Sequence, residues 1–405
     1  MPGPGAGEER AGAGREHSVQ FELSPEQQEL VRLARQVGRD VIAPRAAQVD
    51  AEGVYPEDYF QAFKETGLLG VAIPEEYGGA GLGCLGLVLA VEEVAKHCCT
   101  AGLMLLLTRL STMAISLAGT EAQKREYLEG TATGRRRGAF CLSEPDAGSD
   151  AQAIRTRAVR KGDRYVIQGT KSWISGAGAA DFFVVAAKTR TDVPGARGFS
   201  VFVVDRDTPG VTVGRKEHKM GVRGLPVHQV IFEDVEVPVS SLVGQENEGF
   251  KLIMQNLNAV RPVVAARGLG LAEGALMYWL EYARTRQTFG RPLIEHQGLQ
   301  WMAAELAAEI EACRLLTYRA ASLVDQGRVG REAAHFLSMA KLKATELAVK
   351  AANDCLQMMG AVGYMEDYPM ARFVRDARQL TIVEGTSQIQ KGIIGRALAD
   401  GLLAW

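Results

Sequence analysis

One carboxylate, Glu384, lies where the residue types around it suit the removal of a proton. The charged, helical run before it gives way to the apolar residues Ile382 and Val383, and Gly385 follows, which frees the backbone to turn. Apolar neighbours desolvate a carboxylate and raise its pKa, so that it becomes a usable base near neutral pH. The tripeptide Glu-Gly-Thr alone, however, is more typical of an acidic residue in a surface loop. Other segments must decide between these two interpretations.

The residues after Gly385 have the pattern of a helix start. Ser387 and Gln390 have the spacing of a capping box. The expected apolar face of that helix comprises Ile389, Ile393, Ile394 and Ala397. The sequence therefore predicts a short bend between two helices, with Glu384 in the bend.

Two segments earlier in the chain suit ligand binding. The run 141–150 is rich in small residues and hydroxyl groups, which let backbone amides approach a ligand closely. It is equally typical of a surface turn. In the run 171–176, the ring of Trp173 can lie on a flat heteroaromatic ligand while the hydroxyl of Ser175 reaches the ligand's edge. A Trp in a strand is more often a core residue, so both interpretations stay open.

Two segments near helix ends are equally weak indications of ligand binding. Arg286 follows a helical pattern and can grip a pyrophosphate, although an Arg there is more often a solvated helix end. The small residues within 357–363 permit close backbone approach, but a glycine C-cap explains Gly360 equally well. Each of these segments is a weak indication by itself.

Bulk composition excludes several classes of protein. The chain has 405 residues, of which 47% are hydrophobic and 23% charged, as in ordinary soluble globular proteins. The net charge of −2 argues against nucleic acid as the main partner. The six cysteines show no CxxC or metal-ligand spacing, which predicts buried free thiols in a reducing compartment and no metal site.

Residues 1–18 are rich in Gly, Pro and Ala, and we expect a disordered tail there. They contain no apolar segment typical of a secretory signal, and their acidic residues speak against a mitochondrial presequence. No apolar run is expected to reach the length of a membrane span. A cytoplasmic location without a membrane partner is therefore the expectation.

Hydrophobic periodicity divides the chain into three parts. Residues 19–135 have helical patterns, and Ser24, Pro25 and Gln27 predict the start of the first helix. Residues 136–246 predict a β domain with strands at 164–169, 181–188, 198–204, 211–213 and 228–233. Residues 247–405 predict helices at 247–273, 274–287, 297–326, 331–359 and 388–399. The fold class is thus α+β multidomain: an N-terminal all-α domain, a middle β-sheet or barrel domain, and a C-terminal four-helix bundle.

In this order, the segments resemble the acyl-CoA dehydrogenase family over residues 20–400. The motifs that carry the resemblance are 74–81, 143–150, 173–175, 232–234 with 237–238, 286–290 with 296–297, 357–363, 375–376 and 384–386. The run 261–266 is similar to medium-chain members, and the run 174–178 to isobutyryl-type enzymes. The resemblance implies an oxidoreductase with noncovalently bound FAD, assembled as a homotetramer.

The resemblance also implies a role for each matching position. Glu384 would take the α proton of an acyl thioester while a hydride leaves the β carbon for FAD, giving a trans-2-enoyl thioester. The backbone N–H of Glu384 and a flavin ribityl hydroxyl would stabilise the thioester oxygen. The positions at the flavin and pyrophosphate would be Leu142, Ser143, Gly148, Ser149, Trp173, Ser175, Thr386 and Gln388. The positions at the adenosine half of a neighbouring subunit's FAD would be Arg286, Thr288, Phe289, Gln297, Gln357, Met358, Met359, Gly360 and Ala361. The substrate-binding positions would be Ser149, Asn258, Arg261 and Gly385.

Three positions depart from the family's pattern. Asn258 stands where medium-chain members carry Asp, which leaves the contacts at the CoA end open. Ala361 replaces the second Gly of a Gln-x-x-Gly-Gly run, a mild change unless that position has a positive φ. Val260 is uncharged, so the base position of some branched-chain and long-chain members holds no carboxylate, and Glu384 has no rival.

The leading hypothesis is an acyl-CoA dehydrogenase that passes electrons to an electron-transfer flavoprotein. A dehydrogenase of acyl groups on acyl-carrier protein stays open, because the residues do not separate CoA from a protein-borne pantetheine. An oxidase on the same fold also stays open, since oxygen access depends on cavity shape. Glu384 argues against monooxygenase relatives, which lack it, and the filled chemical positions argue against a non-catalytic scaffold. Acyl chain length and branching depend on pocket depth and cannot be predicted from the sequence.

Overall fold

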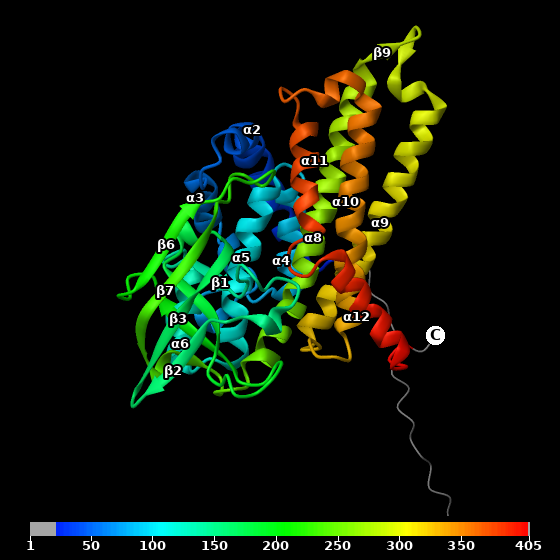
Figure 1. The fold of residues 1–405 in the computed structure, drawn as a ribbon. Coiled ribbons are helices and arrows are strands. Elements are labelled where there is room, and N and C mark those ends of the chain that lie inside the picture. Colours follow the sequence, from blue (N-terminus) through cyan, green and yellow to red (C-terminus); the bar gives the residue numbers. More distant parts are fainter. Residues whose placement is uncertain (1–21, 404–405) are drawn as a thin grey trace, which may run out of the picture.

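The computed structural model describes residues 22–403, and the predicted tail at residues 1–18 lies outside this range. Figure 1 shows a β-sheet and a bundle of long helices, with N-terminal helices between them. Helices α4 (Gly83–Ala95) and α5 (Cys99–Ala118) both pack against α8 (Gly249–Thr285) of the bundle, and α5 also packs against strand β1 (Gly138–Cys141). The predicted α–β–α order is confirmed.

The N-terminal part begins at the predicted residue. The hydroxyl of Ser24 accepts a hydrogen bond from the N–H of Gln27, and the side chain of Gln27 accepts one from the N–H of Ser24, which confirms the capping box. The other helices of this part are α1 (Pro25–Val37), α2 (Ala43–Glu52), α3 (Glu57–Glu65), α6 (Glu121–Gln123) and α7 (Glu129–Ala132). Helix α4 is buried from Gly86 to Ala95, because α1, α5, α8 and α9 (Gln297–Asp325) all pack against it.

Helix α5 is long and apolar enough to cross a membrane, by length and composition only. The expectation that no run reaches this length is therefore wrong. The rest of the protein buries most of the helix, as for the core helix of a globular protein. The six cysteines, two of them at the start of α5, are buried and free, as predicted.

The middle part is an eight-stranded sheet in the order β6-β7-β3-β2-β4-β5-β8, with β1 paired in parallel to β4. The remaining strands are β2 (Arg157–Lys161), β3 (Arg164–Ser175), β4 (Phe182–Lys188), β5 (Phe199–Asp205), β6 (Val211–Lys216), β7 (Val227–Pro238) and β8 (Leu242–Val243). All five predicted strands form, but β3 continues past its predicted end at residue 169. Alternate residues of β4 enter two separate cores: one is shared with the α-helices, and the other consists of residues of the sheet and the segment that joins β3 to β4. The sheet therefore curls on itself while one face packs on α5.

The C-terminal part is a bundle of α8, α9, α10 (Ala334–Met359) and α11 (Pro369–Leu380), followed by α12 (Ser387–Ala399). Helix α10 packs against α8, α9, α11 and α12 and so lies at the centre of the bundle (Figure 1). The predicted four-helix bundle is confirmed. The predicted break at residues 273 and 274 is wrong, because α8 runs unbroken for 37 residues.

Gly274 serves close packing of α8 rather than a helix end. A Cβ at this position would overlap the carbonyl oxygen of Lys96, the cap residue of α4. We expect Gly274→Ala to lower the free energy of unfolding by about 1–3 kcal/mol, measured by urea denaturation. Gly395→Ala in α12 is the control, because a Cβ there meets no atom within 4 Å, and it should gain about 0.5–1 kcal/mol. Equal stability of the two variants would contradict this account.

Candidate active site

Glu384 lies in the bend between α11 and α12, as predicted. The N–H groups of Ile382 and Val383 both donate to the carbonyl oxygen of Gln379, at 2.9 and 3.1 Å, and so form a turn at the end of α11. Glu384 has a φ of 54°, in the left-handed region that residues with a side chain rarely occupy. Such strain persists only where the surrounding structure holds it, and it is common at functional sites.

Two buried side chains, Lys341 of α10 and Gln390 of α12, hold the bend. The Nζ of Lys341 donates to the carbonyl oxygens of Leu380 and Gly385, at 2.8 and 2.9 Å. The Nε2 of Gln390 donates to the carbonyl oxygens of Glu384 and Gly385, at 3.3 and 2.9 Å. These hydrogen bonds stabilise the strained backbone that presents the carboxylate.

The predicted cap of α12 is wrong by one residue. Thr386 is the N-cap, because its backbone is extended and its hydroxyl accepts a hydrogen bond from the N–H of Ile389. Ser387 is the first residue of the helix, and its hydroxyl donates to the carboxylate of Glu346 instead. Gln390 is thereby free to bond the bend. Of the predicted apolar face, Ala397 is buried, whereas Ile389, Ile393 and Ile394 are half-buried.

The carboxylate of Glu384 is desolvated. Its Oε2 is buried and has no hydrogen-bond partner among residues 22–403. Burial raises the pKa of Glu384 above its ordinary value, while the charges of Arg267 and Lys341 oppose the rise. The predicted source of this desolvation is partly wrong, because Ile382 is 54% exposed and the surrounding helices exclude the water instead. A raised pKa suits a base that acts near neutral pH.

No motif pointed to Arg267 or Lys341, although both are fully buried. Arg267 is the one charged residue in the run 262–272 of α8. A lone charge in an apolar helical run is a signal that could have identified it. Lys341 has Lys343 two residues on, so by sequence it is indistinguishable from a lysine on the helix surface.

The loop after β1 is fixed to β3 by a buried lysine. The Nζ of Lys171 donates to the carbonyl oxygen of Leu142 at 3.0 Å and pairs with the carboxylate of Glu144 at 2.8 Å. The N–H of Ser172 donates to the carbonyl oxygen of Ser143 at 2.9 Å. The structure therefore brings together the two predicted segments 141–150 and 171–176.

Trp173 lies outside the core, so the interpretation as a core residue is wrong. The side chain is 57% exposed, and its φ of 59° falls where β3 shifts register against β7. The neighbouring loop is open as well: Gly148 and Ser149 are exposed, and a Cβ at Gly148 would meet no atom within 4 Å. An exposed ring beside an open loop with hydroxyl groups fits the flavin half of FAD. Ser175, half-buried, ends the same strand.

The predicted adenosine-binding positions lie at one end of the bundle, away from the segment 141–150. Helices α8 and α10 end there and α9 begins there, because the three alternate in direction (Figure 1). Phe289, in the hairpin of β9 (Gln287–Thr288) and β10 (Arg291–Pro292), is 97% exposed. Met358 and Met359 are buried in the bundle. The other adenosine positions are exposed or half-buried: Arg286, Thr288, Gln297, Gln357, Gly360 and Ala361. Gly360, with a φ of 66°, caps α10, and Ala361 has no positive φ.

Asn258 and Arg261 are buried beside each other on α8. The Nδ2 of Asn258 donates to the carbonyl oxygen of Val329 at 2.7 Å, and its Oδ1 accepts from Arg261. Arg261 also donates to the hydroxyl of Ser338 at 3.2 Å, and its Nε has no partner among the described residues. Burial lowers the pKa of Arg261 to about 10. Their assignment to substrate binding stays a prediction.

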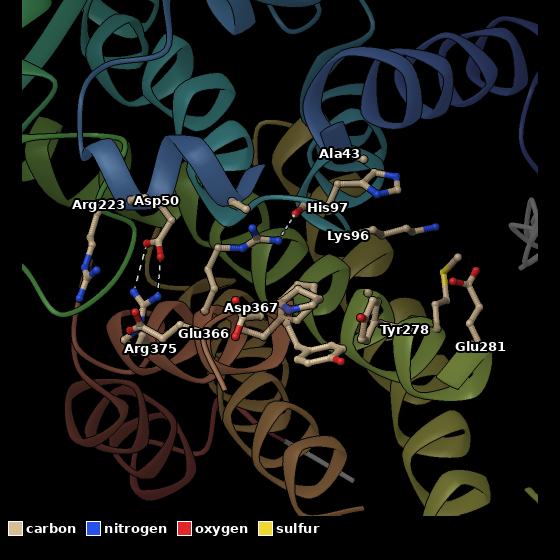
Figure 2. Close-up of a pocket in the computed structure, with 18 residues that line it drawn as sticks. Ala43, Asp50, Lys96, His97, Arg223, Tyr278, Glu281, Glu366, Asp367 and Arg375 are labelled. Carbon is tan, nitrogen blue, oxygen red and sulfur yellow. Dashed lines mark hydrogen bonds and ion pairs between the residues drawn. The ribbon is translucent and has the colours of Figure 1, made fainter. Parts of the chain in front are cut away.

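A hollow of about 420 Å³ lies elsewhere, between α2, α8 and α11 (Figure 2). Arg375 forms an ion pair with Asp50 at its wall, and Arg372 donates to the carbonyl oxygen of His97 at 3.2 Å. Glu384 does not line this hollow. The hollow is therefore separate from the carboxylate of Glu384.

The chain matches the models of three acyl-CoA dehydrogenase domains: the N-terminal domain over residues 24–135, the middle domain over 139–235 and the C-terminal domain over 247–399. It is 40% identical to an acyl-CoA dehydrogenase of Bacillus subtilis, over 94% of this chain and 99% of that protein. It is similar to butyryl-CoA dehydrogenase from Megasphaera elsdenii, with a TM-score of 0.91 and 36% identity over 94% of this chain and 100% of that one. It is also similar to a prolyl acyl carrier protein oxidase, with a TM-score of 0.88 and 26% identity over 93% and 100% of the two chains.

The fold and the site thus define a flavoprotein oxidoreductase. The chain belongs to the acyl-CoA dehydrogenase family, as its motifs predicted. Members of this family usually carry FAD.

Proposed function

We propose that this protein dehydrogenates an acyl-CoA between the α and β carbons, with FAD as its cofactor and Glu384 as the catalytic base. The observation that carries the proposal is the carboxylate of Glu384. Its Oε2 is buried without a partner among the described residues, and its backbone is strained to a φ of 54°. Folding would not favour such a group for stability, because an unpaired buried polar atom is costly.

The chain supplies both the base and a donor for the developing charge. Glu384 removes the α proton, and its raised pKa matches it to that task. The N–H of Glu384 donates to no backbone oxygen within residues 22–403, so it is available to the thioester oxygen, where negative charge develops. FAD, held by the residues named below, would supply the acceptor for the hydride that leaves the β carbon. The product is a trans-2-enoyl thioester.

Two copies of the chain complete each cofactor site in this proposal. Loop 142–149, Trp173 and Ser175 hold the flavin and pyrophosphate, together with Thr386 and Gln388 next to the base. The adenosine positions of the same chain begin about 28 Å along α8 from Arg267, at Arg286. The exposed aromatic side chains at that end, Phe289 and Tyr364, are of the kind that a second copy covers. A homotetramer is the proposed assembly, and the cytoplasm is the proposed location.

An electron-transfer flavoprotein is the proposed electron acceptor, as the family resemblance implies. The second candidate is a dehydrogenase or oxidase of acyl groups on a carrier protein. The likeness to a prolyl acyl carrier protein oxidase keeps this candidate open. The higher identity to an acyl-CoA dehydrogenase, 40% against 26%, favours CoA.

Anaerobic titration of the yellow holoenzyme with acyl-CoAs tests the proposal. We expect at least one acyl-CoA to bleach the oxidised flavin absorbance, because hydride transfer reduces the flavin. Bleaching by an acyl-carrier-protein thioester but by no acyl-CoA would favour the second candidate. Rapid reoxidation of the reduced, product-bound enzyme by air would instead favour an oxidase.

A further inference from the structure

Arg267 of α8 is a fully buried cation with unused hydrogen-bond donors. Its Nη2 donates to the Oε1 of Gln379 at 3.0 Å and to the Sγ of Cys99 at 3.4 Å. Its Nε and Nη1 have no partner among residues 22–403. Buried charges are normally paired, because an unpaired buried donor loses its hydration without compensation. The folded chain therefore leaves two donors of Arg267 for an acceptor from outside.

Arg267 lies near the base but does not bond to it. Burial has the largest effect on the pKa of Glu384 and raises it. The charge of Arg267 has the second largest effect and lowers this pKa. The Oε2 of Glu384 nevertheless has no partner, and Arg267 donates to Gln379 and Cys99 instead. Gln379 is the residue whose carbonyl oxygen closes the turn before Glu384. A ligand at Glu384 thus lies next to a guanidinium group with free donors.

Position along α8 indicates which part of a substrate meets Arg267. The resemblance places Asn258 at the CoA end and Val260 where some relatives carry their base, next to the α carbon. Arg267 follows Val260 by seven residues, two helical turns and about 10 Å along α8, and so lies on the same face of the helix but further from the CoA end. The Cγ of Arg267 packs against Gly102 of α5, where an added Cβ would lie 3.2 Å away. This contact fixes the stem of the side chain. Arg267 therefore faces the acyl part of the substrate rather than the CoA part.

The charges around Arg267 also favour a further anion. Lys219 and Lys341 are the neighbouring cations, and burial, with repulsion from Arg267, lowers the pKa of each to about 8. Asp376 and Glu384 are the neighbouring carboxyl groups. Asp376 already accepts a hydrogen bond from the N–H of Val222 at 2.5 Å, and burial raises its pKa to about 6. Cations thus outnumber carboxylates in this interior.

We infer that Arg267 binds a carboxylate carried by the acyl chain beyond its β carbon, so that the substrates are acyl-CoAs with an acidic chain end. The inference rests on the proposed function, because it places the α carbon at Glu384. An alkyl chain at this place would leave both free donors of Arg267 unpaired. A site built to hydrogen-bond a substrate group can discriminate against an analogue that lacks this group by a factor of about 10⁴.

Equilibrium binding to the Glu384→Gln holoenzyme tests the inference separately from catalysis. The probes are pairs of acyl-CoAs of equal chain length that end in a methyl group or in a carboxylate, and the readouts are flavin absorbance and titration calorimetry. We expect the tightest carboxylate-ended probe to bind at least about 100-fold more tightly than its methyl-ended partner. Adding Arg267→Met should remove most of this preference, and Arg267→Lys should restore part of it. The binding readout stays valid even if Glu384 is not the base.

If the Glu384→Gln holoenzyme binds the paired probes equally, or binds the methyl-ended probes more tightly, the inference is overturned. No Arg267 variant is needed for this result. A preference that survives Arg267→Met would also overturn it. So would an Arg267→Met enzyme that keeps its chain preference and only shifts its pH profile of turnover upward, since Arg267 would then be a positioning residue for Glu384. The matched control is Arg331→Met, which removes an arginine whose side chain is 75% exposed and should leave the preference unchanged.

Discussion

Glu384→Gln should retain FAD and lose turnover by a factor of about 10²–10⁴, because an amide cannot accept the α proton. The substitution keeps the size of the side chain, and the bend does not depend on the carboxylate: Lys341 and Gln390 bond its backbone carbonyl groups. The measurements are steady-state kcat and the rate constant of flavin reduction in a single turnover, with the absorbance spectrum as the check on bound FAD.

Glu346→Gln is the control for this prediction. It makes the same chemical change in a nearby carboxylate, which accepts a hydrogen bond from the hydroxyl of Ser387. We expect it to retain most of the turnover. Substantial activity in Glu384→Gln would remove Glu384 from its role. In the wild type, kcat should fall as pH drops through the pKa of Glu384, which burial places above the ordinary carboxyl value.

Lys341→Met should impair both stability and the base. The variant leaves the carbonyl oxygens of Leu380 and Gly385 without their charged donor, and a hydrogen bond to a charged group contributes about 1.5–3 kcal/mol. It also removes one of the two cations that oppose the rise in the pKa of Glu384. The acid limb of kcat against pH should therefore move to higher pH, by one unit for about each 1.4 kcal/mol of lost interaction.

In the wild type, the charge of Lys341 can be removed by pH alone, without a substitution. Burial lowers the pKa of Lys341 to about 8, so its positive charge is lost as pH rises through that value. Lys343→Met is the control variant, because that side chain is 59% exposed and makes only a long ion pair of 3.8 Å with Glu309. It should change stability by less than about 0.5 kcal/mol. An unshifted acid limb in Lys341→Met would show that Lys341 does not act on the base.

Local patterns in the sequence predicted the parts of the site that neighbouring residues determine. The bend at Glu384 follows from Gly385 and from the end of one helical pattern and the start of another. The capping box at Ser24 and the five predicted strands of the middle domain are likewise local, and they form, although β3 extends past its predicted end. The cap of α12 was misplaced because Thr386 and Ser387 are chemically equivalent as caps, and the backbone conformation decides between them.

Contacts between residues that are far apart in the chain cannot be predicted from local sequence patterns. Lys341 and Gly385 are 44 residues apart, and Arg267 and Gln379 are 112 residues apart. Periodicity places each residue on a helix face, but it does not say which helix that face meets. The same limit explains the false break at Gly274, where the reason for a glycine is the approach of α4. The exposure of Trp173 depends on a register shift against β7, which only the assembled sheet reveals.

The unbroken helix α8 has a consequence for how the protein would hold its cofactor. Its 37 residues extend about 55 Å, with the proposed substrate contacts in one half and the adenosine positions beyond its end. If a second copy completes each site as proposed, cofactor release and subunit dissociation become coupled equilibria. FAD would then stabilise the assembly by mass action, and dilution of the apoprotein would favour separate chains.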